Sequence, residues 1–147
     1  MARALINGLA GACVLTVAHE LVRKSKPNAP RLDILGMRSV AKIMTAFGVE
    51  PPQASTLKKY AFIADIASNT LMFSGVGAKP GISTWLKGIN LGLMAGVGAI
   101  TVPQKIGLGK DSALLTKRTT ATALTTVGLY VLGGLAAAAV AQVGRKK

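Results

Sequence analysis

The sequence contains little of what catalytic and metal sites are usually built from. Its 147 residues include one cysteine (Cys13), one histidine (His19) and five acidic residues. One cysteine excludes an internal disulfide and a multi-cysteine metal site, and one histidine excludes a histidine-rich metal site. No nucleophile-elbow motif lies near His19, and residues 107–111 lack part of the phosphate-loop pattern. We therefore expect no enzyme activity, no metal and no cofactor.

Large side chains are also scarce. Aromatic residues make up 4% of the chain, although 50% of it is hydrophobic and the mean hydropathy is +0.46. A soluble core needs large, interdigitating side chains. Membrane helices instead favour glycine and alanine, because close backbone approach supplies their packing. The composition therefore indicates an integral membrane protein, and the length indicates a single domain, residues 1–147. Cys13 is expected to be a small buried residue.

Basic residues far outnumber acidic ones, and the net charge is +13. On a soluble domain this excess would suggest nucleic-acid binding. Here the lysines and arginines lie almost entirely between and beyond the apolar runs, where membrane proteins carry cations that face lipid headgroups. We therefore expect membrane lipids, anionic ones in particular, as partners, and no nucleic acid. A membrane-protein partner or a homo-oligomer stays open.

Four apolar runs approach the ~20 residues that a helix needs to cross a bilayer. The first could be a cleaved signal peptide, but its apolar character continues past Cys13 to Val22, which favours a retained helix. Only residues 79–81 separate the second run from the third, which predicts an antiparallel hairpin. The expected fold class is all-α, a polytopic membrane helical bundle. The four transmembrane helices are expected at residues 4–22, 60–78, 82–102 and 119–143.

The distribution of charge also bears on orientation. Four spans place both termini on one side of the membrane, with six lysines and arginines there and twelve on the other side. The positive-inside rule then favours external termini and cytoplasmic larger loops. The basic C-terminal tail argues for the opposite orientation.

A fifth helix, amphipathic, is expected at residues 31–47. Pro30 and Asp33 suit its start, and Gly48 suits its end. Its apolar face opposes a basic stripe, and the segment is too polar to span a membrane. It is expected either to lie in the interface, with the stripe against anionic lipid, or to cap the bundle. The stripe consists of Arg31, Arg38 and Lys42.

Small residues recur at helical spacing in the last two runs. Gly88, Gly92 and Gly96 lie on one face of the third run, and Gly133 and Ala137 form a similar surface in the fourth. Such faces let helices approach closely. We expect them to pack helices within the bundle, with a pore or a homo-oligomer as the alternative.

Polar residues inside the runs form a candidate intramembrane site. Asp65 and Asn69 share a face of the second run, Glu20 and His19 lie near the end of the first, and Asn90 is in the third. A charged carboxylate inside a membrane is energetically unfavourable, so such a residue is usually paired or functional. One interpretation is a proton- or ion-responsive site or a headgroup pocket. The other is a structural network in which Asp65 pairs with a lysine, namely Lys58, Lys59 or Lys87.

Several strings resemble small multi-spanning proteins of bacterial inner membranes. They are His19-Glu20, residues 29–38, residues 65–69 and residues 129–139. The resemblance implies the bacterial inner membrane and a helical bundle, and it implies no activity. The first functional hypothesis is a structural, accessory or assembly role. The second is a small transporter, channel or lipid-handling protein that uses Glu20 and Asp65, and it requires a cavity that reaches both.

Overall fold

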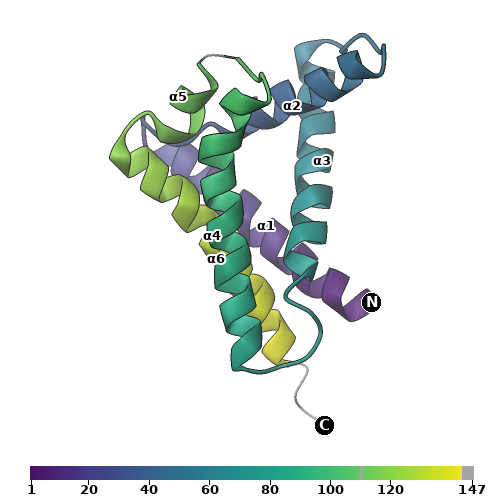
Figure 1. Cartoon of the computed structure of the whole chain (residues 1–147), viewed down its shortest axis with the longest axis vertical. Helices are drawn as coiled ribbons and strands as arrows, with labels where there is room; N and C mark the ends of the chain where they lie inside the picture. The colour runs from purple at the N-terminus through teal and green to yellow at the C-terminus, as the bar shows by residue number, and fades with distance from the viewer. Residues whose placement is uncertain (110, 144–147) are drawn as a thin grey trace.

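The structure is a computed structural model that describes residues 1–109 and 111–143. These residues form six helices and no strand (Figure 1), which confirms the expected all-α fold. The helices are α1 (Ala2–Ser25), α2 (Leu32–Ala46), α3 (Ala54–Ser74), α4 (Ile82–Lys105), α5 (Ser112–Lys117) and α6 (Thr120–Val143).

Three helices, α1, α4 and α6, are long and apolar enough to cross a membrane, each with 24 residues. The remaining expected span falls in α3, which does not reach the same hydropathy. This helix begins at Ala54, before the apolar run, so it includes Lys58 and Lys59 as well as Asp65. It ends at Ser74 rather than residue 78, because a turn follows in which Gly77 adopts φ +88°.

The end of the third run differs from expectation. The run was expected to end at residue 102, but α4 continues through Pro103 to Lys105. The short helix α5, which was not predicted, lies between α4 and α6. The bounds of α2 agree closely with the amphipathic helix expected at residues 31–47, since Arg31 and Phe47 are its cap positions.

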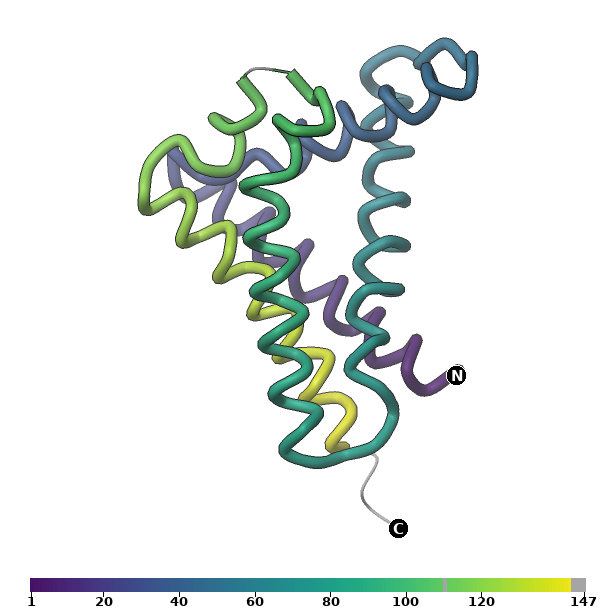
Figure 2. The backbone as a smooth tube through the Cα atoms, in the orientation of Figure 1, coloured from purple at the N-terminus to yellow at the C-terminus, as the bar shows by residue number. Residues whose placement is uncertain are grey.

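Helices α4 and α6 pack along each other, with their backbones in close approach (Figure 2). A Cβ atom on any of three of the glycines of α4, namely Gly88, Gly92 and Gly96, would collide with the backbone of α6. The side chains of large residues are therefore excluded from this interface, as the glycine pattern requires. The contacts pair Gly88 with Gly134, Gly92 with Val131 and Gly96 with Val127.

Helix α1 lies between α3 and α6 and packs against both. Its Gly8 faces the backbone of Thr70 in α3, and its Gly11 faces Gly133 in α6. Beside these contacts, the fully buried ring of Phe73 fills the centre of the core. Helices α3 and α4 run in opposite directions, as expected of a hairpin, but they touch at few positions (Figure 1). Helix α2 packs against α3 near the upper end of the bundle (Figure 1).

Candidate functional site

Asp65 lies at the middle of α3, eleven residues after Ala54 and nine before Ser74. Its carboxylate accepts hydrogen bonds from two neutral side chains. The Asn69 amide donates to Oδ1 at 2.9 Å, and the Thr16 hydroxyl of α1 donates to Oδ2 at 3.4 Å. Asp65 forms no ion pair within residues 1–109 and 111–143, so the lysine pairing considered from the sequence is not formed there.

A cavity of about 180 Å³ reaches Asp65 between α1, α2 and α3. Three of the five acidic residues of the chain line it, namely Glu20, Asp33 and Asp65, together with His19 and Lys58. The structure therefore brings together most of the polar residues that the sequence had singled out. The remaining lining is largely apolar and consists of Leu15, Thr16, Leu32, Gly36, Ala61 and Phe62.

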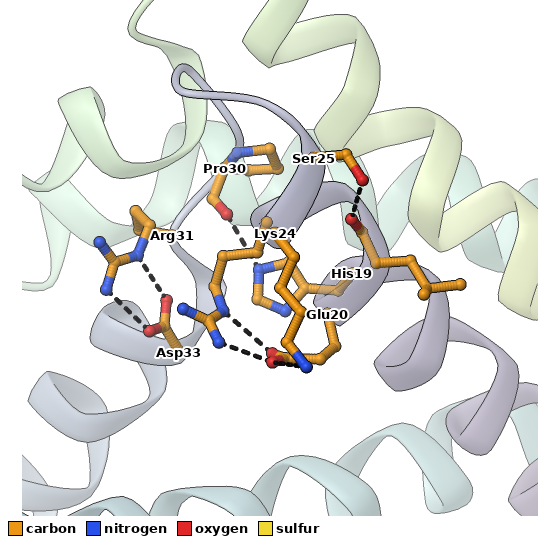
Figure 3. Close-up of polar contacts among 9 residues, drawn as sticks. His19, Glu20, Lys24, Ser25, Pro30, Arg31 and Asp33 are labelled. Atoms are coloured by element: carbon orange, nitrogen blue, oxygen red, sulfur yellow. Dashed lines mark hydrogen bonds and ion pairs between the residues drawn. The ribbon is translucent and has the colours of Figure 1, made fainter.

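Two of these acids are already neutralised by cations. Glu20 accepts two hydrogen bonds from the Arg23 guanidinium, at 2.6 and 2.9 Å, and lies 3.4 Å from the Lys24 ammonium (Figure 3). Asp33 accepts two from Arg31, at 2.9 and 3.0 Å. Burial alone would raise the pKa of Asp33, but its bonds to Arg31 hold that pKa below its usual range. Asp65 is therefore the lining acid without a cationic partner.

His19 joins the end of α1 to the loop that leads into α2. Its buried Nε2 lies 2.9 Å from the Pro30 carbonyl oxygen (Figure 3). Because a carbonyl only accepts, Nε2 must carry the proton and donate it. This bond fixes the loop beside the cavity, and it gives His19 a structural role as well as a place in the lining.

Two residues do not lie where the sequence placed them. Asn90, expected in the intramembrane site, is exposed on α4 and does not line the cavity. Cys13, expected to be buried, is exposed on α1. In both cases neighbouring small residues take the buried face: Gly88 and Gly92 face α6, and Gly11 and Ala12 are buried beside Cys13.

The basic stripe of α2 is partly used within the chain. Arg31 is paired with Asp33, and Arg38 forms two 2.9 Å bonds to Asp111 and one of 3.2 Å to the Leu108 carbonyl. The bonds from Arg38 lower the pKa of Asp111. Lys42 is exposed and forms no ion pair with the described part of the chain. It is the one cation of the three whose charge remains available.

Several of the lining residues were not predicted from the sequence. Asp33 reads as a helix-start residue, and Phe62 and Gly36 read as ordinary members of apolar faces. They reach the cavity because α2 crosses α3 at Gly36, where an added Cβ would lie 3.7 Å from the Ala61 Cβ. A crossing point of this kind depends on the tertiary arrangement.

Comparison with known proteins supplies no relative: no protein-family model, no curated protein and no solved structure matches the chain.

Proposed function

We propose that this protein is a small transport or lipid-handling protein that binds the cationic group of a membrane-soluble ligand at Asp65. The observation that carries the proposal is the cavity shared by Asp65, Glu20 and His19. Asp65 is the member of this set that no cation neutralises among the described residues. An anionic ligand would meet three carboxylates there, whereas a cationic ligand would form an ion pair with the unpaired carboxylate of Asp65.

The proposal includes a fourth span, α3. At ~1.5 Å per residue, its 21 residues extend about 30 Å, the thickness of a bilayer core. Lys58 and Lys59 lie in the first two turns, from which long side chains can reach the headgroups. Asp65 is then about 10 Å further along the helix. With α3 in the membrane, α2 lies in the interface, where Lys42 faces anionic lipid.

The membrane assignment is the bacterial inner membrane, with the larger loops in the cytoplasm. The excess of lysine and arginine in those loops supports this orientation. It places the α2 end of the bundle, where Lys58 lines the cavity, on the cytoplasmic side.

The test uses a photoreactive long-chain alkylammonium and the purified full-length protein in liposomes. We expect the probe to label the cavity, and dodecylammonium to compete where uncharged dodecanol does not. Asp65→Asn removes the charge with little change in shape. It should lower labelling about tenfold or more, the effect of losing one charged hydrogen bond.

The matched control is Glu50→Gln, which removes one carboxylate from an exposed position outside the cavity. Its labelling should equal that of the unmodified protein. Equal labelling of the Asp65→Asn and unmodified proteins would contradict the proposal.

An assembly role is the second candidate. The observation that favours it is Gly128 on α6, where an added Cβ would meet nothing within 4 Å. The exposed side chains of Leu124 and Leu132 flank this small residue, which gives a second membrane helix a place to approach. Crosslinking in native membranes tests it: a specific adduct that Gly128→Leu abolishes would support assembly through α6.

A further inference from the structure

Two more hollows adjoin the cavity beneath α2. One, of about 270 Å³, lies between α2, α3 and α6, and the other, of about 440 Å³, lies between α2, α3 and α4. Their linings share Leu35, Ser39, Ser68 and Tyr130, so the two hollows are adjacent, and together they are named the α3–α4 groove. The groove exists because α4 packs on α6 and leaves α3 apart.

The groove and the cavity meet at Asp65. This residue lines both, together with Leu32, Gly36 and Ala61. The Asn69 amide, which donates to the Asp65 carboxylate, lines the groove further along. A group bound to Asp65 therefore lies at the junction, with the acid-lined cavity on one side and the groove on the other.

The lining of the groove is suited to hydrocarbon. The described residues that form it include one acid, Asp65, and no lysine, arginine or histidine, although the chain carries a net charge of +13. The hydroxyl groups of Ser39 and Ser68 donate to carbonyls of their own helices. The Tyr130 hydroxyl makes no hydrogen bond with another described residue, which leaves one donor for a ligand.

Small residues on α4 keep the groove open. Ala95, Gly98 and Ala99 line it, and a Cβ atom on Gly98 would meet nothing within 4 Å. The other glycine face of α4 is fully occupied by α6, so Gly98 does not serve that contact. The open space beside Gly98 is therefore part of the groove.

We infer that the ligand is a single-chain amphiphile whose cationic head binds Asp65 and whose hydrocarbon chain lies in the α3–α4 groove. The inference rests on the proposed function and adds the substrate class. The observation that supports the inference is that Asp65 lines both the cavity and the groove, because a head group bound to Asp65 can place its hydrocarbon chain in the groove. The lack of cationic lining favours this occupant over an anionic lipid.

The experiment compares two photoreactive alkylammonium probes of equal length in liposomes containing the full-length protein. One has its reactive group beside the head, and the other has it near the end of the chain. We expect the first to label residues of the cavity such as Phe62, and the second to label residues of the groove such as Met72 and Val102. Gly98→Leu should lower chain-end labelling of the groove about tenfold, since added methylenes occupy the same space.

The matched control is Ala139→Leu. Ala139 is exposed on α6 and lines neither hollow of the groove. It should leave both labelling patterns unchanged, and thermal unfolding of both variants establishes that each is folded.

The outcomes separate the two proposals. Chain-end labelling of lipid-facing residues such as Val17, unaffected by Gly98→Leu, would overturn the groove while head-group labelling of the cavity upheld the binding function. Failure of the head-group probe to label the cavity would overturn both.

Discussion

Arg38 of α2 and Asp111, separated by 73 residues, form a two-point ion pair with both bonds at 2.9 Å. Arg38 also holds the Leu108 carbonyl, so one side chain ties α2 to the segment that leads into α5. Leu108 is buried at this contact. The position of α2 above the groove is therefore fixed from the α4–α5 connection as well as from α3.

This ion pair should make the attachment of α2 sensitive to acid. The folded protein holds the pKa of Asp111 below its ordinary value of 3.8. The contribution of the pair is thus fully present above that pH and is lost as the pH falls through the lower folded-state pKa. Hydrogen exchange of α5 amides between about pH 6 and pH 3 should show protection falling at the acidic end. In Asp111→Asn, protection should be lower at neutral pH and this acid-dependent part should vanish; an unchanged profile would refute the assignment.

The glycine contact between α4 and α6 gives a stability prediction. Gly88→Ala places a Cβ against the Gly134 backbone, so the helices must separate. We expect a loss of about 1–3 kcal/mol in the free energy of unfolding, the range for overpacked sites. Gly98→Ala makes the same chemical change where there is open space and should be close to neutral. Denaturant unfolding in detergent measures both, and equal stabilities would show that the contact is not tight.

Cys13 provides a test of α1 as a membrane span. It lies near the middle of the helix and is exposed, and no other cysteine competes for reagent. In intact liposomes it should react with a lipid-soluble maleimide and resist a charged, water-soluble thiol reagent. Denaturation in detergent should make it reactive to both. Rapid reaction with the charged reagent in intact liposomes would place this part of α1 in water.

Lys42 is the residue through which we expect α2 to contact anionic lipid. Arg31 and Arg38 are engaged with carboxylates, so Lys42→Glu should have the largest effect of the three reversals. Each surface cation contributes about 1 kcal/mol to such binding, so enrichment of anionic lipid should fall about fivefold or more. Lipids retained by the purified protein in mixed nanodiscs can be counted by native mass spectrometry. Discs of neutral lipid are the control, and unchanged enrichment would remove lipid contact from the role of α2.

The sequence predicted helix positions and helix ends best where a local pattern of residues determines them. Long apolar runs predicted α1, α4 and α6, and Gly48 predicted the end of α2. The buried face of α1 was not predictable, because this helix is apolar on nearly all sides and its periodicity is weak. Cys13 was assigned to the wrong face for that reason.

The candidate site was predictable only in part. Placing Asp65, Glu20 and His19 in one site followed from their positions in neighbouring helices, and the cavity contains all three. Asp65 was expected near the start of its helix, because the predicted span began at residue 60, after Lys58 and Lys59. The helix instead begins at Ala54 and includes both lysines, since lysine is a good helix former. The Arg38–Asp111 pair and the α3–α4 groove depend on how α2 crosses the bundle, and no local pattern encodes that crossing.

The contact of Gly11 with Gly133 joins the first helix to the last. A ribosome makes these residues in order, so α1 is synthesised long before its partner exists. Until α6 follows, the Gly11 face of α1 lacks the surface that covers it in the folded bundle. The contact therefore forms only after α6 is made, and truncation before α6 should leave α1 without one of its two packing partners.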